Sequence, residues 1–285
     1  FEKTLEYFIN SNPISVRVNT SKAKTFEVLK ELEDEGIKVW KSSLNEDVLY
    51  ISNFDRVEDI KPIVKGSCYI TDVSSSMISK LLIPNNIKKA VGICAAPGGK
   101  SFLLADKISK DAEIFSCDIS ESKVNLIKEN SKKQGFLNIY PTVADALVYD
   151  ERFCDSDLVL ADLPCSGIGI IGKKPDIKYR LEPENINSLA KLQEKMLDNA
   201  ARYVKTGGEL IFSTCTLNKK ENEDNVFDFL ERHSEFKAVD LTKRLTDAEI
   251  KNFNIEELKK GYLKLIPGRD GCDGFFIAVF RRDND

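Results

Sequence analysis

Apolar segments alternate with amphipathic segments along most of this chain, and the two periodicities predict strands and helices in turn. In the first quarter, short alternating or apolar runs predict strands at 14–19, 37–40, 48–51 and 66–72. Helical spacing at 22–36, ending at a glycine, predicts one helix among them. These elements make up a small α+β module, which we assign to residues 1–70.

Beyond residue 70 the predicted strands and helices follow each other regularly. Apolar runs predict strands at 90–94, 113–118, 138–142, 158–162, 209–214 and 274–280. Helical spacing predicts helices at 73–82, from 99 onward, and at 121–135, 186–204 and 220–232, and the last strand is preceded by a polar segment. Such alternation produces a mostly parallel, doubly wound sheet. We therefore predict an α/β domain over residues 71–285.

Composition places the chain among ordinary globular proteins. Of its 285 residues, 42% are hydrophobic and 31% are charged, and no apolar run reaches the length of a membrane-spanning helix. The first ten residues lack a signal-peptide pattern, so we expect a cytoplasmic protein with no membrane partner. A net charge of −4 gives no overall signal for nucleic acid, so such a partner would have to meet a local basic patch.

The seven cysteines point to thiol chemistry at two positions. Their number is odd and no two form a Cys-x-x-Cys pair, which argues against a disulfide framework and a zinc site. Cys165 and Cys215 each follow an apolar strand, and ligands bind at the carboxyl ends of strands in such sheets. A thiolate there would be a nucleophile, although small packed cysteines are an equally good interpretation of both. Packing is the better interpretation of Cys68, Cys117, Cys154 and Cys272.

A glycine-rich turn, Pro97-Gly98-Gly99, separates a predicted strand from a predicted helix. Glycine lets the backbone approach a ligand closely, and Asp118 follows Gly98 by 20 residues at the end of the next strand. That spacing is typical of an acid that binds the ribose of an adenosine cofactor. The alternative for Asp118 is an ordinary helix N-cap.

A P-loop is a rival interpretation of the same turn. Gly99-Lys100-Ser101 ends like a Walker A motif, and the strand ending in Asp162 resembles its acidic partner. The motif needs a glycine six positions before the lysine, and that position is Cys94. We therefore favour the adenosine cofactor over a nucleoside triphosphate.

Four strings together resemble the RNA cytosine-5 methyltransferases of the Sun (Fmu) type, also called the NOL/NOP/Sun family. They are Cys-Ala-Ala-Pro-Gly-Gly-Lys at 94–100, Asp-Leu-Pro-Cys-Ser-Gly-Ile-Gly at 162–169, Ser-Thr-Cys-Thr at 213–216 followed by Glu-Asn-Glu at 221–223, and Asp-Gly-Phe-Phe at 273–276. The resemblance runs from about Pro13 to Arg281, and the segment 173–179 is most similar to the bacterial small-subunit ribosomal RNA enzymes. It implies a Rossmann-like class I methyltransferase domain dependent on S-adenosylmethionine, behind a small RNA-recognition-like module.

The resemblance also implies roles for the site residues. Cys215 would add to carbon 6 of the cytosine, Asp162 would hold a proton on nitrogen 3, Cys165 would help to release the product, and Lys100 would point toward the active site. The cofactor would lie against Asp118 at its ribose, Asp145 near its adenine, Asp162, and the turn formed by Cys94, Ala95, Ala96, Pro97, Gly98, Gly99 and Lys100. Because the cytosine must leave any stack, loop or single-stranded RNA is the expected substrate.

This chain departs from the family at two places near the cofactor turn. Gly92 stands where an aspartate is usual, which puts one cofactor contact or loop support in doubt, and Lys123 stands where an arginine is frequent. A basic cluster just after Cys165 is placed to meet phosphates, although solvated lysines are the ordinary explanation; it consists of Lys173, Lys174, Lys178 and Arg180. Arg17 and Asn19 lie on the first strand of the RNA-recognition-like module.

The resemblance leads us to expect methylation of cytosine carbon 5 in small-subunit ribosomal RNA by a monomeric enzyme. Transfer RNA is the nearest alternative substrate, and a non-catalytic RNA-binding assembly factor, favoured only by Gly92, is an alternative of another class. Relatives often carry a helical NusB-like domain upstream, and a chain beginning at Phe1 rather than methionine leaves room for one.

Overall fold

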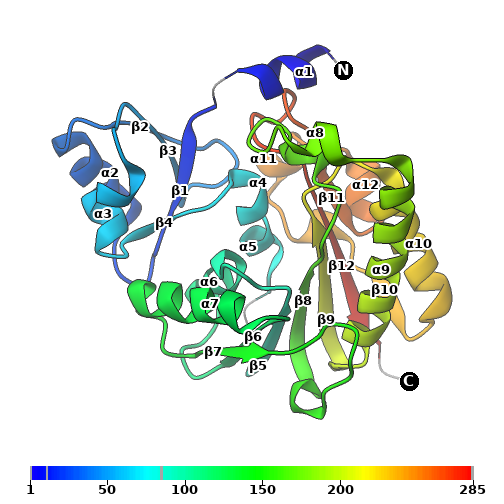
Figure 1. Ribbon diagram of the computed structural model, residues 1–285. Coiled ribbons are helices and arrows are strands. Elements are labelled where there is room, and N and C mark those ends of the chain that lie inside the picture. Colours follow the sequence, from blue (N-terminus) through cyan, green and yellow to red (C-terminus); the bar gives the residue numbers. More distant parts are fainter. Residues whose placement is uncertain (1, 11, 84–85, 284–285) are drawn as a thin grey trace.

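The computed structural model describes residues 2–10, 12–83 and 86–283. Residues 14–70 form a four-stranded antiparallel sheet in the order β2-β3-β1-β4, on the left of Figure 1. Its strands are β1 (Ile14–Val18), β2 (Lys38–Lys41), β3 (Val48–Ser52) and β4 (Cys68–Ile70). Helices α2 (Thr25–Asp34) and α3 (Lys61–Val64) bury Val28, Leu32 and Ile63 against one face. The short helix α1 (Glu2–Ile9), which the sequence pattern did not predict, precedes this module.

The second sheet has the strand order β10-β12-β9-β8-β5-β6-β7. Its parallel strands are β5 (Lys89–Ile93), β6 (Glu113–Asp118), β7 (Ile139–Val143), β8 (Ser156–Asp162) and β9 (Val204–Thr214). Strand β12 (Phe275–Arg282) runs antiparallel to β9 and also pairs with β10 (Phe236–Ala238) and β11 (Tyr262–Leu265). The chain moves outward from β5 to β7 and then returns to β8 on the other side of β5. This reversal opens a crevice at the carboxyl ends of β5 and β8.

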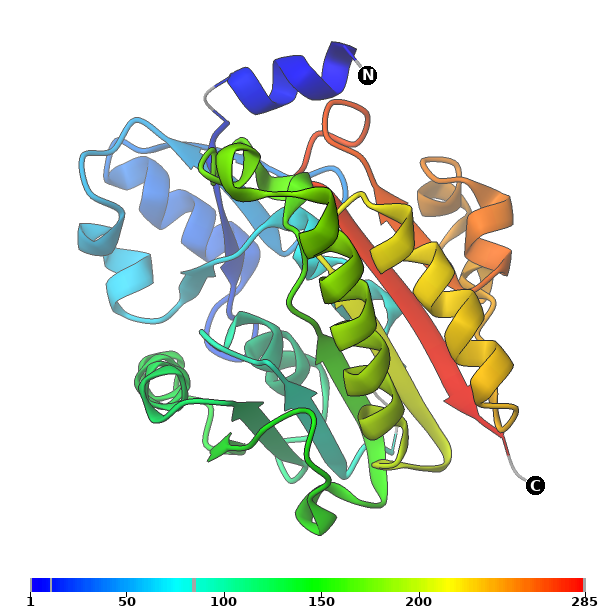
Figure 2. The same ribbon diagram turned by 45° about the vertical axis from the view of Figure 1, so that its right-hand side comes forward.

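Helices cover both faces of this sheet, so the predicted α/β class and doubly wound arrangement are confirmed. One face carries α4 (Val73–Ser76), α5 (Ile78–Leu81), α6 (Gly99–Lys107) and α7 (Glu121–Gln134). The other carries α9 (Pro183–Ala201) and α10 (Glu223–Arg232), which lie in front of β9 and β12 in Figure 2. Successive residues of a strand pack on opposite faces of the sheet. Ala90 lies in the hydrophobic core under α4 to α7, and Val91 lies in the core under α9 and α10.

The structure differs from the predicted elements in two regions. The single helix predicted at 73–82 is two short helices, α4 and α5, which meet at Met77. The polar segment before the last strand holds β10, the 3-10 helix η5 (Leu241–Lys243), α11 (Asp247–Ile250), α12 (Ile255–Lys259) and β11. Each of these elements is short and buries few side chains, so its periodicity is too brief to show in sequence. Further short elements are η1 (Val57–Asp59), η2 (Glu151–Phe153), η3 (Ile168–Ile170), α8 (Ile177–Arg180) and η4 (Lys219–Glu221).

The first module is attached to the second domain by buried polar contacts. Arg17 on β1 is fully buried, and its Nη2 lies 2.8 Å from Oδ2 of Asp106 in α6. Asn19 is equally buried and donates from Nδ2 to the backbone oxygen of Gln134 in α7 at 2.9 Å. Both side chains are therefore used in docking the two parts and are not exposed to a ligand. Because Tyr69 of β4 also packs into the core shared with α4 and α5, a boundary at residue 70 stays a prediction.

None of the helices in the described ranges is both long and apolar enough to cross a membrane.

Candidate active site

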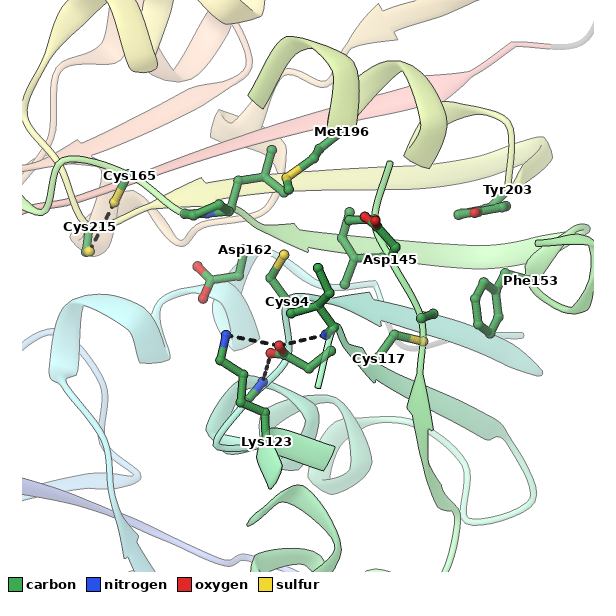
Figure 3. A pocket seen from close by; sticks show the side chains of 18 residues that line it. Cys94, Cys117, Lys123, Asp145, Phe153, Asp162, Cys165, Met196, Tyr203 and Cys215 are labelled. Carbon is green, nitrogen blue, oxygen red and sulfur yellow. Dashed lines mark hydrogen bonds and ion pairs between the residues drawn. The ribbon is translucent and has the colours of Figure 1, made fainter. Parts of the chain in front are cut away.

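A cavity of about 320 Å³ lies at the carboxyl ends of β5, β6 and β8, where the strand order reverses. Figure 3 shows the side chains around it. Its wall includes five residues expected from the sequence to form the site: Cys94, Ala96, Asp118, Asp145 and Asp162. Cys165 and Cys215 line the same cavity. The strand ends therefore bring together side chains that lie as far as 121 positions apart in sequence, from Cys94 to Cys215.

The turn from β5 into α6 is held by the acid at the end of the neighbouring strand. Asp118 is buried, and its Oδ2 accepts a hydrogen bond from the backbone nitrogen of Ala96 at 3.1 Å. Lys123 places Nζ 3.1 Å from the other oxygen of Asp118. Gly98 has φ +111°, and a Cβ there would lie 2.6 Å from the ring of Phe102, so the turn requires glycine. Asp118 thus supports the turn while one side of its carboxylate lines the cavity.

A second cavity of about 160 Å³ adjoins the first on the other side of this turn. Four more of the predicted turn residues lie here, namely Ala95, Pro97, Gly99 and Lys100, whereas Gly98 lines neither cavity. Gly92 lines it too, and a Cβ at that position would meet Ala95 Cβ at 3.6 Å and Ser101 Oγ at 3.7 Å, which are ordinary contacts. A Cβ at position 92 would therefore be accommodated, while the support of the turn comes from Asp118.

The sulfur atoms of Cys165 and Cys215 lie 3.2 Å apart and are turned toward each other in Figure 3. The two residues follow the adjacent strands β8 and β9, and both thiols are free. The hydrogen bond from Cys165 lowers the pKa of the Cys215 thiol, although burial opposes this. The same hydrogen bond, together with burial, raises the pKa of Cys165. Either sulfur can donate this hydrogen bond, and the two shifts favour Cys165 as the donor and Cys215 as the thiol that loses its proton first.

The two other cysteines at the cavity, Cys94 and Cys117, have raised pKa values, unlike Cys215. Burial raises the pKa of Cys94 to about 12, with Asp118 adding to the effect. Burial also raises the pKa of Cys117 to about 12. Both therefore stay protonated near neutral pH, and Cys215 is the thiol best suited to act as a nucleophile.

Asp162, the last residue of β8, is held from both sides. Its Oδ1 accepts a hydrogen bond from Ser213 Oγ at 2.7 Å, and its Oδ2 lies 2.6 Å from Nζ of Lys100. Lys100 Nζ also lies 5.2 Å from the centre of the Phe275 ring. The strand-end carboxylate and a lysine ammonium are thus fixed in the crevice that contains the cysteine pair.

The apolar end of the larger cavity consists of residues that sequence reasoning did not select. Phe153, Met196 and Tyr203 lie there, on η2, α9 and the turn before β9. In sequence they look like ordinary core residues, and only the fold shows that they border a cavity. Figure 3 shows the rings of Phe153 and Tyr203 on the side away from Cys165 and Cys215, with Met196 between these rings and the cysteines.

Part of the basic cluster after Cys165 is already paired. Lys173 bridges Asp72 and Asp273, with Nζ 2.6 and 2.8 Å from their carboxylates. Burial and the neighbouring Asp72 raise the pKa of Asp273 to about 7, which Lys173 opposes. Arg180 pairs with Asp176. Lys174 and Lys178 are exposed, and Lys174 lines a further cavity of about 400 Å³ that also reaches Cys165 and Cys215.

Across residues 2–10, 12–83 and 86–283, no group of three or more His, Cys, Asp or Glu side chains is arranged to hold a metal ion.

The sequence of the chain matches a known protein family. The family described as 16S rRNA methyltransferase RsmB/F matches residues 79–281. The chain belongs to this family. The resemblance seen in the four sequence strings is therefore confirmed at family level.

Individual relatives agree with this assignment. The probable ribosomal RNA small subunit methyltransferase B of Bacillus subtilis is 35% identical over 271 residues, which cover 94% of this chain and 59% of that protein. The ribosomal RNA small subunit methyltransferase F of Escherichia coli O157:H7 is 29% identical over 277 residues, covering 94% and 57%. The chain thus spans about three fifths of the length of these relatives.

A solved structure has the same fold over nearly the whole chain. The methyltransferase homolog protein from Pyrococcus horikoshii superposes with a TM-score of 0.82 at 25% identity, covering 98% of this chain and 90% of that one. The Rossmann-like methyltransferase fold expected from the sequence is therefore confirmed.

Proposed function

We propose that this chain is the catalytic part of an enzyme that methylates carbon 5 of a cytosine in small-subunit ribosomal RNA. The observation that carries the proposal is the Cys165–Cys215 pair at the edge of a cofactor-sized cavity that Asp162 also lines. The names of the two curated relatives support the class of RNA.

The cavity residues fit S-adenosylmethionine, and the fit rests on their chemistry. Asp118 offers a buried carboxylate for the ribose hydroxyls, and half-buried Asp145 and the backbone of the 94–100 turn offer further polar groups. Phe153, Met196 and Tyr203 provide an apolar surface for a planar ring. When bound, the cofactor supplies an electrophilic methyl group.

Three side chains would act together to activate the cytosine. Carbon 5 of cytosine is a poor nucleophile, and a new bond between the Cys215 sulfur and carbon 6 would make carbon 5 enamine-like. As the thiolate adds, nitrogen 3 would take a proton from solvent and donate it in a hydrogen bond to the Asp162 carboxylate, which Lys100 would hold in place with Nζ 2.6 Å from Oδ2.

The second half of the reaction restores the ring and frees the enzyme. After methylation a base removes the proton from carbon 5, and the bond between sulfur and carbon 6 breaks with return of its electron pair to Cys215. Cys165, 3.2 Å from that sulfur, is the nearby thiol that would assist this release. The reacting base must be unstacked to reach Cys215, which favours a loop or single strand of RNA.

Methyl transfer from labelled S-adenosylmethionine tests the proposal. Unmodified small-subunit ribosomal RNA and transfer RNA are offered in parallel, and the labelled nucleoside is identified. We expect 5-methylcytidine in the ribosomal RNA, and at least a thousandfold lower rate with Cys215→Ala. Label in transfer RNA alone would contradict ribosomal RNA as the substrate. Full activity of Cys215→Ala would contradict Cys215 as the nucleophile.

A further inference from the structure

Glu221 is a fully buried carboxylate placed between the two loops that carry the cysteines. It ends η4 and begins the Glu-Asn-Glu string, yet it lines none of the three cavities described above. Its side chain therefore does not reach cofactor or substrate, and the proposed reaction gives it no role. Its contacts indicate what it does instead.

Both carboxylate oxygens of Glu221 bind the residue that follows Cys165. Oε1 accepts a hydrogen bond from the backbone nitrogen of Ser166 at 2.8 Å, and Oε2 accepts one from Ser166 Oγ at 2.5 Å. Gln193 on α9 also donates to Oε1, from Nε2 at 3.1 Å. The loop of Cys165 is thus fixed at the position next to the sulfur-bearing residue.

The same carboxylate reaches the residue that follows Cys215. Thr216 Oγ1 lies 3.5 Å from Oε2 of Glu221 and 2.7 Å from Ser166 Oγ, so the two hydroxyls and the carboxylate form one buried group. Asn222 extends the network, since it accepts from Thr214 Oγ1 at 2.6 Å and donates to the backbone oxygen of Thr216 at 3.0 Å. Cys215 is therefore held on both sides.

The energetics favour a positional role over simple packing. Among the residues that the structure describes, no Lys, Arg or His side chain forms an ion pair with Glu221. A buried carboxylate without a cation is costly, and only hydrogen bonds offset that cost. An apolar side chain of similar size would fill the space more cheaply but would leave both cysteine loops untethered.

We infer that Glu221 is a positioning residue that sets the separation of the Cys165 and Cys215 sulfur atoms. The carboxylate joins Ser166 to Thr216, and because each of these directly follows a cysteine, the distance across the carboxylate fixes the distance between the sulfurs. The inference about geometry stands apart from the reaction, and only its catalytic consequence rests on the proposed function.

The sequence offers a matched control two residues away. Glu223 is also buried, but it pairs with Lys264 and none of its bonds reaches a cysteine loop. Replacing Glu223 by alanine removes a buried carboxylate from the same segment, so it reproduces the general destabilisation without loosening the sulfurs. Glu221→Gln is the conservative variant, because its amide oxygen can accept from Ser166 and Gln193 while its amide nitrogen donates to Ser166 Oγ.

Disulfide formation with diamide measures the sulfur separation without RNA or cofactor. The two thiols lose two electrons and two protons, diamide becomes the hydrazine, and mass spectrometry of the linked peptides gives the rate. Because the bond requires strict geometry, we expect Glu221→Ala to slow it about tenfold. Wild type, Glu221→Gln and Glu223→Ala should react alike. Equal rates for Glu221→Ala and Glu223→Ala would overturn the inference.

A second variant covers the case in which Glu221→Ala does not fold. Ser166→Ala keeps the carboxylate and the backbone contact but removes the hydroxyl that links Glu221 to Thr216. We expect slower disulfide formation than in wild type at an unchanged melting temperature. A wild-type rate in this variant would count against the inference.

The kinetic constants distinguish a positioning role of Glu221 from a general contribution to stability. With active wild-type enzyme, Glu221→Ala should lower kcat about tenfold at an unchanged KM for RNA, and Glu221→Gln should restore it. A rise in KM alone would contradict positioning of the thiols. If the wild-type chain methylates no RNA, the proposed function fails, whereas the disulfide rates still decide the role of Glu221.

Discussion

Lys100 Nζ lies 2.6 Å from Oδ2 of Asp162, which joins the first turn of α6 to the end of β8. Ser213 binds the other oxygen of the carboxylate, so the ion pair has a fixed orientation. The lysine is partly exposed and lines the second cavity, and beside the hydrogen bond with Cys165 its charge helps to lower the pKa of Cys215. Its charge is therefore available to the group that adds to Cys215 in the proposed reaction.

Removing this charge should affect chemistry more than cofactor binding. We expect Lys100→Met to lower the single-turnover rate of methyl transfer about a hundredfold, because the proton at nitrogen 3 loses its support. Calorimetry should show nearly unchanged affinity for S-adenosylmethionine. Lys107→Met is the control, since Lys107 ends the same helix and pairs with Asp47 instead. Equal activity of the two variants would contradict the role of Lys100.

Loss of the second thiol should trap the reaction part-way. Cys165→Ala keeps the nucleophile but removes the neighbour 3.2 Å from its sulfur. We expect a covalent complex between protein and RNA to accumulate, visible as a slower band on denaturing gels. The band should vanish in the Cys165→Ala/Cys215→Ala double variant. Rapid turnover of Cys165→Ala without any complex would argue against a part in release.

Cofactor affinity should depend on the acid that supports the turn. Asp118→Asn weakens the acceptor for Ala96 and for ribose hydroxyls, so we expect about tenfold weaker binding of S-adenosylmethionine by calorimetry. Asp111→Asn serves as the comparison, because Asp111 is exposed in the loop before β6, at the strand's other end. Similar losses in both variants would show that the effect is general.

The reactivity of Cys215 should rise at a lower pH than that of an ordinary thiol. Its pKa is lowered first by the hydrogen bond with Cys165, so the thiolate should form at a lower pH than in an unperturbed cysteine. Below this pKa the sulfur is protonated and is alkylated slowly, and above it the thiolate is alkylated fast. We expect iodoacetamide alkylation, followed by peptide mass spectrometry, to show the midpoint between these two rates. In Cys165→Ala the midpoint should move to higher pH, and an unmoved midpoint would contradict the assigned donor.

The part of the site that lies at strand ends could be predicted from sequence. Cys165, Cys215, Asp118 and Asp162 each follow an apolar run, and parallel strands bring their carboxyl ends to one edge. The apolar wall could not be predicted in this way. Met196 sits on a helix with the same periodicity as any buried face, so nothing local distinguishes a cavity residue from a core residue.

Charged residues were the least predictable, because their partners are distant in sequence. In sequence Lys173 is placed either to meet phosphates or to be solvated, but Asp72 and Asp273, about a hundred residues away on either side, bind it instead. Arg17 lies on a strand of a module expected to bind RNA, but it pairs with Asp106 of the other domain. Such pairings follow from how domains dock, which composition and spacing do not specify.

The buried contacts of Arg17 and Asn19 join the small antiparallel sheet to helices α6 and α7. These contacts favour one orientation of that sheet relative to the cysteine loops. An RNA that touches both surfaces would have to match that orientation through its own curvature. In that case the RNA would need a bend between the segment that contacts the small sheet and the nucleotide that enters the active site. The position of this bend in the RNA would then determine which cytosine reaches Cys215.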